Sequence, residues 1–387
     1  MNSNLASQLL SSVMRWDYLK LNSERPVLEF MGSMKYDAYD RFMPGTRFIS
    51  NLVQWLSQFD EEDRSTVLEF IKEKLVFISS TQMDYLVDLL YESKIRPILQ
   101  KKATENADMS SYMLCNKEVQ HQFEIEKRSS LVIGLSDGAH TDILRRSAGF
   151  SNEQVLTNYY PDGKKLKDML KDLQEDKEFK EVENPHFRNI FLIDDFTASG
   201  KSFVRYDEKE KKFKGKLSKI IEQICAENIE RTEAEIAQGM KEELHLSYLL
   251  DRNQQEIHID ILFCMATHKA EVNIRKNLDV FLKECGYDKV KYRIHIVQPL
   301  NDSLSTDITG DPILMKVLKK PQYFHQKLKE DKAYNVGSTD NAFLGFDECA
   351  LPVVLSHNTP NNSLPILWQD TDNDEEFKGL FPRISRH

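Results

Sequence analysis

Five short apolar runs in the second part of the chain restrict its fold more than any other feature. They cover residues 130–135, 189–194, 257–266, 292–300 and 351–356. Their β-branched and aromatic residues predict strands, and their near-continuous apolarity predicts strands that are buried on both faces. Amphipathic stretches that predict covering helices lie near residues 141–147, 164–173, 216–226 and 270–284. The pattern predicts an α/β fold with a largely parallel sheet and helices on both faces.

The first hundred residues differ because their apolar residues fall at helical spacing. Leu52, Trp55 and Phe59 share one helical face, and Ser79 with Gln82 has the form of a capping box. No catalytic constellation appears in this part of the sequence. We therefore expect a helical region that packs against the rest of the protein or docks a protein partner.

A polar stretch at residues 101–109 separates the helical pattern from the alternating one. We therefore expect a helical N-terminal domain over residues 1–105 and an α/β domain over residues 106–387. Residues 230–251 interrupt the alternation without a motif of their own, and we expect a helical insertion there.

Composition excludes several classes of protein. The formal charge of −10 argues against general nucleic-acid binding, because affinity for phosphate backbones comes largely from clustered Lys and Arg. The five cysteines are scattered without CxxC pairs or metal-ligand spacing, so we expect reduced packing residues. No window approaches the roughly 18–20 consecutive apolar residues of a membrane helix, and no secretory signal pattern precedes the helices. We expect a cytoplasmic protein.

The run at residues 189–194 leads into a pair of acids. Asp194 and Asp195 stand at the carboxyl end of the predicted strand, and ligands of open α/β sheets bind at that edge. Two adjacent acids there are costly unless something pairs with them. Sugar hydroxyls and a divalent cation are suitable partners, because carboxylates accept hydrogen bonds from vicinal hydroxyls and attract hard cations.

A small, hydroxyl-rich loop follows the acids, with the sequence TASGKS at residues 197–202. Backbone N–H groups of such a loop converge on a phosphate, and hydroxyls add donors. The ending GKS raises the alternative of a Walker A loop, but that motif requires glycine where Asp195 stands. A strand followed by an uninvolved polar turn is the other alternative. A sugar phosphate is one ligand that would satisfy the acids and the loop together.

Residues 189–203 closely resemble the phosphoribosyl-pyrophosphate (PRPP) motif of type I phosphoribosyltransferases, an apolar run followed by two acids and a Thr/Ser-rich loop. The resemblance implies that Asp194 and Asp195 hold the ribose 2- and 3-hydroxyls and, directly or indirectly, Mg²⁺. It also implies that the following residues wrap the 5-phosphate: Phe196, Thr197, Ala198, Ser199, Gly200, Lys201 and Ser202. Lys201 departs mildly from the family pattern, although it adds favourable charge.

A second loop follows the predicted strand at residues 130–135 and resembles the pyrophosphate loop of the same fold. Its residues are Ser136, Asp137, Gly138, Ala139 and His140. Glycine permits the unusual backbone geometry that such a loop needs. An ordinary strand–helix turn is the alternative, but the position one strand before the acids favours a functional loop.

A polar, proline-broken turn follows the last predicted strand and contains His357, Asn358, Asn361 and Asn362. Because it follows a strand, we expect it near a sheet edge, where it could close over the site or contact an acceptor. A turn stabilised by Asn side chains is the alternative.

Over the whole chain, the order of motifs resembles a bacterial phosphoribosyltransferase-like family associated with anti-phage conflict systems. The shared features are RF-x-x-x-L-x-x-WL at residues 47–56, the core IDDF-x-A-SGKS, the turn H-N-x-P-N-N and the tail LFPR at residues 380–383. The PRPP motif is the most specific of them.

Two functions follow from the resemblance, and the sequence leaves both open. In the first, the protein is an enzyme that binds PRPP with Mg²⁺ and transfers the phosphoribosyl group to an acceptor, releasing pyrophosphate. In the second, it binds PRPP, a nucleotide or a related sugar phosphate without transfer and serves as a sensor or assembly subunit of a defence complex. We lean towards the glycosyltransferase, although the sequence names neither the acceptor nor a general base.

Overall fold

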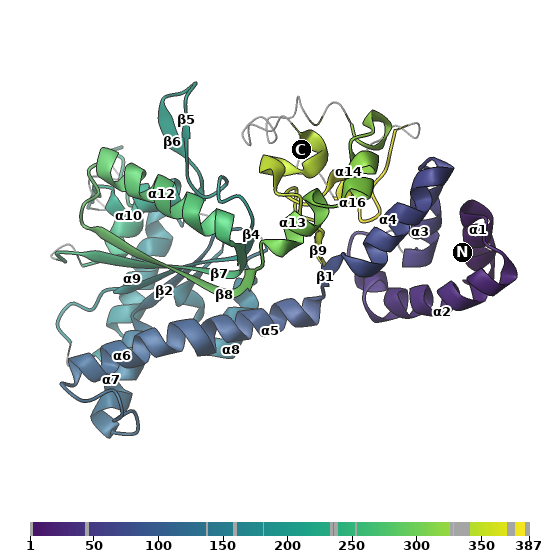
Figure 1. Ribbon diagram of the computed structural model, residues 1–387. Helices are drawn as coiled ribbons and strands as arrows, with labels where there is room; N and C mark the ends of the chain where they lie inside the picture. Colours follow the sequence, from purple (N-terminus) through teal and green to yellow (C-terminus); the bar gives the residue numbers. More distant parts are fainter. Residues whose placement is uncertain are drawn as a thin grey trace. The chain divides into compact units, whose positions relative to one another are not determined.

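The computed structural model describes residues 3–42, 46–136, 138–157, 161–180, 182–232, 235, 239–251, 254–325, 328, 341–369 and 376–383. Contacts divide the chain into two compact units, whose elements are labelled in Figure 1. Unit 1 joins residues 1–83 to residues 300–387, and unit 2 is the continuous segment 84–299. Within the described residues, no helix is long and apolar enough to cross a membrane.

A five-stranded sheet forms the centre of unit 2, in the order β3, β2, β4, β7, β8. The strands are β2 (Ser130–Gly134), β3 (Val155–Leu156), β4 (Asn189–Thr197), β7 (Ile257–Thr267) and β8 (Val290–Leu300). The pairs β2–β3, β2–β4 and β4–β7 are parallel. The N–H of Ile257 donates to the carbonyl of Lys289 (2.9 Å), which places the starts of β7 and β8 together. The predicted α/β fold with a mainly parallel sheet is confirmed.

Helices of unit 2 pack against this sheet through apolar faces. In Figure 1, α10 and α12 lie on one side of the sheet, and α6 and α8 lie on the other. Leu170, Ile221 and Ile274 belong to the same buried core as the strand residues Leu192 and Ile261. The helices are α6 (Arg96–Asn106), α7 (Lys117–Arg128), α8 (Thr141–Ala148), α9 (Gly163–Gln174), α10 (Lys216–Cys225) and α12 (His268–Glu284), and the π-helical η2 (Tyr91–Ile95) joins α5 (Ser80–Leu90) to α6.

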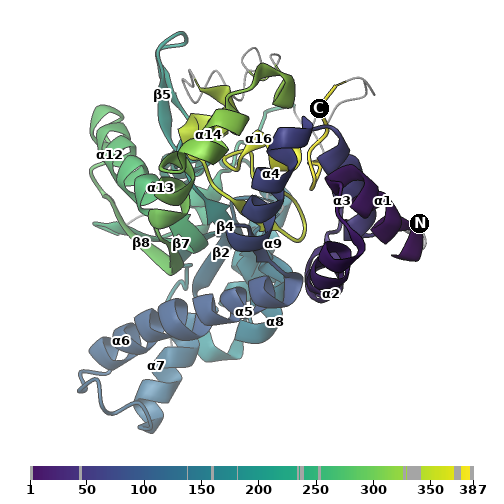
Figure 2. The ribbon, with the colours of Figure 1, turned by 45° about the vertical axis from the view of Figure 1, so that its right-hand side comes forward.

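An antiparallel hairpin separates β4 from the helix expected after it. The hairpin consists of β5 (Arg205–Asp207) and β6 (Lys212–Lys214), and it stands away from the sheet in Figure 1 and Figure 2. Lys214 forms an ion pair with Asp207 (2.7 Å) inside the hairpin. The chain then returns to the sheet, and α10 begins at Lys216.

Unit 1 is built from both ends of the chain. Its N-terminal part holds α1 (Ser3–Met14), α2 (Tyr18–Met34), η1 (Tyr36–Ala38), α3 (Phe48–Ser57), α4 (Glu61–Glu73) and β1 (Val76–Ile78). Its C-terminal part holds α13 (Ser303–Thr309), α14 (Pro312–Leu318), η6 (Pro321–Tyr323), η8 (Ala342–Leu344), η9 (Phe346–Glu348), β9 (Val353–Leu355) and α16 (Pro365–Trp368). Phe48 and Phe381 are stacked in one core, and the indole N–H of Trp55 donates to the carbonyl of Ile366 (2.8 Å).

This division differs from the expected domains 1–105 and 106–387. The predicted strand at residues 351–356 forms as β9, but it pairs in parallel with β1 in unit 1 and is absent from the five-stranded sheet of the described residues. The physical reason is a shared core, because aromatic residues from both chain ends are buried against one another. Apolar periodicity shows that a segment is buried but does not show which distant segment it meets.

The helical insertion expected near residues 230–251 falls partly outside the described residues, so it stays a prediction. An antiparallel bridge joins Ile229 to Glu243, and the 3₁₀ helix η5 (Leu246–Leu249) follows it. Residues 233–234 and 236–238 of this segment lie outside the described residues. At the start of α5 the predicted capping box is confirmed, because Ser79 and Gln82 exchange side-chain and backbone hydrogen bonds (3.0 and 3.2 Å).

Candidate functional site

The carboxyl ends of β2 and β4 bring two of the predicted loops together. The parallel register pairs Gly134 with Ile193, so the residues that follow each strand lie at the same edge of the sheet. The next strand, β7, ends opposite β4, because Thr197 pairs with Ala266. Ligands of parallel α/β sheets bind at this edge. The acids, the loop after them and the loop after β2 are therefore neighbours within unit 2.

Asp194 is buried and fully engaged with the protein around it. It is 1% exposed. Its Oδ1 accepts hydrogen bonds from the Ser136 hydroxyl and from the backbone N–H of Asp195 (3.1 Å). Its Oδ2 accepts from the Lys216 ammonium (2.8 Å). Burial raises the pKa of the Asp194 carboxyl to about 6, although the Lys216 charge opposes the rise.

Lys216 is a site residue that the sequence reasoning missed. It is the first residue of α10, and its backbone N–H donates to the carbonyl of Ser202 at 3.2 Å. Its ammonium also lies 4.7 Å from the centre of the Phe203 ring. Gly215 makes this approach possible, because a Cβ there would lie 2.2 Å from the Phe203 carbonyl oxygen. The available signal was a lysine at the start of the amphipathic stretch 216–226, but the hairpin that delivers it was not predicted.

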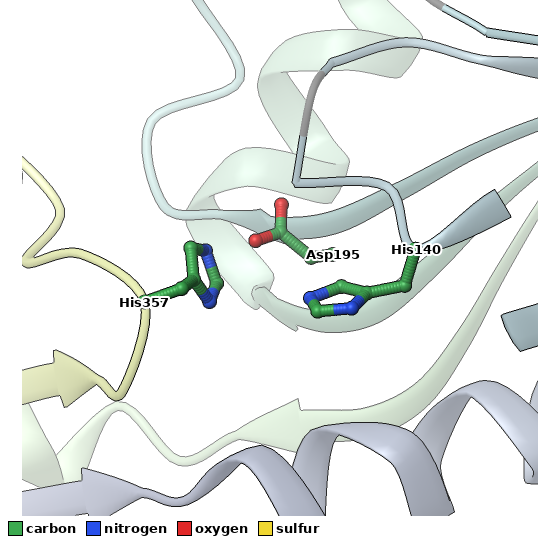
Figure 3. A group of neighbouring side chains, drawn as sticks. All are labelled: His140, Asp195 and His357. Carbon is green, nitrogen blue, oxygen red and sulfur yellow. The ribbon is translucent and has the colours of Figure 1, made fainter. Parts of the chain in front are cut away.

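Asp195 lies beside the loop that follows β2. It is 8% exposed, and its Oδ1 accepts a hydrogen bond from the N–H of Phe196 (2.8 Å). A carboxylate oxygen of Asp195 and a ring nitrogen of His140 lie within 4.8 Å of each other. Figure 3 shows the imidazole ring of His140 beside the Asp195 carboxylate. His140 takes the left-handed backbone conformation (φ 48°) immediately before α8. The structure thus brings the predicted acid pair and the predicted pyrophosphate loop together.

The loop after the acids is held by β7 and α12. Gly200 has φ 73°, and a Cβ there would lie 2.7 Å from the carbonyl oxygen of Ala270. The Thr267 hydroxyl donates to the carbonyl of Ala198 (2.6 Å), and the Asn273 amide donates to the carbonyl of Ser199 (2.9 Å). Two loop carbonyls are therefore tied to the protein, which suits a loop whose N–H groups serve an anion.

Thr267 and Asn273 are further residues that the sequence reasoning missed. Thr267 was recognisable only as a residue between the third predicted run and the helix after it. Its hydroxyl also caps α12 by accepting from the N–H of Ala270 (3.0 Å). Exposure varies along the loop of residues 197–202, called the held loop below. Thr197 and Ser199 are buried, Lys201 is half-buried and Ser202 is exposed. Hydroxyls of the loop therefore differ in their access to a ligand.

The remaining predicted site residues fall into three groups. Ser136, Gly138, Ala139 and His140 lie in the turn between β2 and α8, whereas Asp137 lies outside the described residues. The predicted turn at His357–Asn362 belongs to unit 1, so its part in the site stays a prediction. Its contacts there are those of a structured turn. The carbonyl of His357 accepts a hydrogen bond from the Arg41 side chain (2.9 Å), and the Asn358 side chain accepts one from the N–H of Thr359 (3.0 Å). The carbonyl of Asn361 accepts from the N–H of Phe346 (2.8 Å), and the side-chain amide of Asn362 donates to the carbonyl of Phe346 (3.1 Å).

The chemistry available at this edge is recognition of hydroxyls and anions. Cys264, on β7, is the thiol whose pKa responds to the acids: burial raises it well above its ordinary value, and Asp195 and Asp194 raise it further. A thiol that stays protonated is a poor nucleophile. The groups of this site that can recognise hydroxyls and anions are therefore the acids, the held loop and Lys216.

Comparison with protein-family models finds the PRTase-CE family, which is phosphoribosyltransferase-like, over residues 52–383. The matched range includes β2, β4, the held loop and Lys216. No curated protein and no solved structure matches the chain.

Proposed function

The chain belongs to the PRTase-CE family, and we propose that it binds PRPP, or a related ribose 5-phosphate or nucleotide, at the carboxyl edge of the unit 2 sheet. One observation carries this proposal: two buried acids lie near the carboxyl end of the central strand β4, and the strand leads into a glycine loop whose carbonyls accept hydrogen bonds from Thr267 and Asn273. Hydroxyl recognition and phosphate recognition then lie a few residues apart, as a ribose 5-phosphate requires.

In the bound state, the 5-phosphate lies in the loop of residues 197–202. Backbone N–H groups and the hydroxyls of this loop donate to the phosphate oxygens, and Lys201 adds positive charge near them. The ribose hydroxyls approach the acid pair near the carboxyl end of β4 and donate to the carboxylate of Asp195. The turn between β2 and α8, with His140, faces the pyrophosphate end of the ligand.

The described residues fit a Mg²⁺ ion that arrives with its ligand. Mg²⁺ usually keeps several waters and binds one or two carboxylates together with substrate phosphates. Asp195 supplies a carboxylate at this edge beside His140, and three donors of the protein surround Asp194. We propose that Asp195 contacts the ion directly or through water. When bound, the ion would neutralise negative charge on the pyrophosphate.

The reaction we propose is transfer of the phosphoribosyl group to an acceptor. The bond between the anomeric carbon and pyrophosphate breaks, pyrophosphate leaves with the bonding electrons, and the acceptor forms the new bond and loses a proton. Because the transition state resembles an oxocarbenium ion, the protein contributes mainly positioning and electrostatic stabilisation. The acids orient the ribose, and the loop fixes the 5-phosphate.

Calorimetry of the full chain with PRPP and Mg²⁺ tests binding, and pyrophosphate release in the presence of nucleobases or cell extract tests transfer. We expect Asp195→Asn to weaken PRPP binding by about tenfold or more, because hydrogen bonds to charged groups carry roughly 1.5–3 kcal/mol. Asp207→Asn is a matched control, since this acid pairs with Lys214 in the hairpin. Absence of binding to PRPP, ribose 5-phosphate and nucleotides would exclude the proposal.

A second candidate, a sensor or assembly subunit without transfer, is favoured by a surface feature of unit 1. Large apolar side chains are exposed on α1 and α2, namely Leu5, Leu9, Tyr18, Leu19, Val27, Phe30 and Met34. Val27, Phe30 and Met34 are spaced three and four residues apart on α2, so they share one helical face, and exposed apolar faces are typical of protein-docking sites. PRPP or nucleotide binding without pyrophosphate release would favour this candidate over the enzyme.

The biological role we propose is bacterial anti-phage defence. It rests on the resemblance of the whole chain to a conflict-associated family and on membership of the PRTase-CE family. Phage plating on bacteria that express the wild-type chain or Asp195→Asn tests it. We expect protection by the wild type and its loss in the variant, and equal plating on both strains would contradict the role.

A further inference from the structure

We propose that the two adjacent acids divide their work: Asp194 is a positioning residue that fastens Ser136 and Lys216, and Asp195 receives the ribose hydroxyls. The inference rests on the proposed function for the identity of the ligand that Asp195 meets. It does not rest on it for the role of Asp194, which follows from contacts within unit 2.

The first observation is that the carboxylate of Asp194 already accepts hydrogen bonds from the protein. An ionised carboxylate has about four acceptor sites, and three donors of the protein already approach Asp194: the Ser136 hydroxyl, the N–H of Asp195 and the Lys216 ammonium. The residue is 1% exposed. About one acceptor site is left, and burial closes it to a sugar hydroxyl unless one of these donors moves away. Loss of Lys216 would leave the carboxylate buried without its counter-charge.

Lys216 carries the second step, because it connects Asp194 to the phosphate loop. Its ammonium meets Asp194, and its backbone N–H meets the carbonyl of Ser202. The Phe203 ring lies under the same ammonium at 4.7 Å. Gly215 fixes the entry into α10 by its φ of 142° and its contact with the Phe203 carbonyl. One ion pair thus joins the end of β4 to the loop that ends at Ser202.

Ser136 carries the third step, because it opens the turn between β2 and α8. Its hydroxyl donates to the carboxylate oxygen of Asp194 that also accepts from the N–H of Asp195. Asp194 therefore holds the start of the pyrophosphate-type turn, the backbone of Asp195 and the start of α10. A residue with these three attachments sets the spacing between the elements that would meet pyrophosphate, ribose and 5-phosphate.

A second-site rescue distinguishes positioning from direct contact. Asp194→Asn leaves the ammonium of Lys216 without its partner, and Lys216→Gln leaves a buried carboxylate without its counter-charge. The double variant replaces the ion pair by a neutral amide pair that can form a hydrogen bond. It thereby avoids the uncompensated charge that each single variant leaves. If Asp194 only positions its neighbours, the second substitution should therefore recover what the first one loses.

We would measure PRPP and ribose 5-phosphate binding by calorimetry, and melting temperature by circular dichroism, for the wild type, both single variants and the double variant. We expect each single variant to bind about tenfold or more weakly. The double variant should recover most of this loss and melt at a higher temperature than either single variant. A double variant that binds no better than Asp194→Asn would overturn the positioning role.

Asp194→Asn combined with Lys214→Gln is the matched control. Lys214 pairs with Asp207 and Glu210 in the hairpin, so its replacement should give no rescue. Rescue by both lysine substitutions would also overturn the proposal, because the effect would then be a general one of charge. If the wild type binds neither ligand, the proposed function fails, and the melting temperatures alone then uphold or overturn the role of Asp194.

Discussion

The two edges of the sheet in unit 2 both bury acids, yet they treat them in opposite ways. At the carboxyl edge, burial raises the pKa of Asp194, and the Lys216 charge only partly offsets that rise. At the amino edge, burial also raises the pKa of Asp260, but hydrogen bonds from His295 and Arg293 outweigh it and the pKa is lowered. The surroundings of Asp194 therefore disfavour its charged form, whereas those of Asp260 favour the charged form.

The amino edge is closed by partners from regular elements. Arg293 makes two hydrogen bonds to Asp260 (2.8 and 2.9 Å), and His295 adds one at 2.7 Å, both from the neighbouring strand β8. Beside them, buried Glu126 accepts from the side chain of Asn189 at 2.8 Å. At the carboxyl edge, the partners of Asp194 come instead from a turn and from the first residue of a helix. The carboxyl edge thus takes partners from connecting segments, where binding residues of a rigid scaffold commonly lie.

The largest expected effect concerns the pH dependence of stability at the carboxyl edge. Folded Asp194 keeps its proton up to about pH 6, whereas an unfolded aspartate releases it near about pH 4. Protons are then bound more tightly in the folded state, so the Asp194 contribution to the unfolding free energy falls as pH rises through this window, by on the order of 3 kcal/mol. Denaturant unfolding of the wild type and Asp194→Asn between pH 4 and pH 7 should show a shallower fall in the variant. Parallel curves would contradict the raised pKa.

The next effect concerns Asp260 and has the opposite sign. Because its pKa is lowered in the folded state, its contribution is present above the ordinary aspartate pKa and is lost as pH falls below about 4. We expect Asp260→Asn to cost about 1–3 kcal/mol at pH 7 and to leave PRPP binding by the folded protein unchanged. Glu256→Gln is the control, because this exposed acid at the same edge forms an exposed ion pair with His258 (3.4 Å), which contributes little to stability. Weaker PRPP binding by Asp260→Asn would remove the distinction between the two edges.

The last effect, similar in size to that of Asp260→Asn, concerns the backbone of the phosphate loop. Gly200→Ala places a Cβ at φ 73° and 2.7 Å from the Ala270 carbonyl, and we expect a loss of about 1–3 kcal/mol. Gly286→Ala is a matched control, since Gly286 has φ 71° but no atom within 4 Å of the added Cβ. Thermal unfolding of both variants separates the cost of the contact from that of the conformation. Equal losses would mean that α12 does not hold the loop.

Local pattern predicted much of the carboxyl edge. The runs at residues 130–135 and 189–194 predicted β2 and β4, and parallel pairing then placed the turn after β2 beside the acids. The TASGKS loop was predicted in position, and Gly200 takes the left-handed conformation that such loops use. These features depend on residues that are close in sequence, where apolar spacing and glycine act directly.

Features that depend on distant residues escaped prediction. Lys216 reaches Asp194 only because a hairpin returns the chain to the sheet, and the loop carbonyls are tied by Thr267 and Asn273 from beyond β7. The pairing of β9 with β1 likewise depends on a core that joins both chain ends. Apolar periodicity cannot select among such partners, because every buried segment carries the same signal.

The sequence by itself determined the α/β pattern, the acid pair and the glycine loop, because each arises from propensities and spacing within a short segment. Only the tertiary structure decided that Asp194 is enclosed by Ser136 and Lys216 while Asp195 lies beside His140. Two neighbouring residues of one strand point to opposite faces of the sheet. Identical carboxylates therefore meet different surroundings, and their pKa values, partners and proposed roles follow from those surroundings.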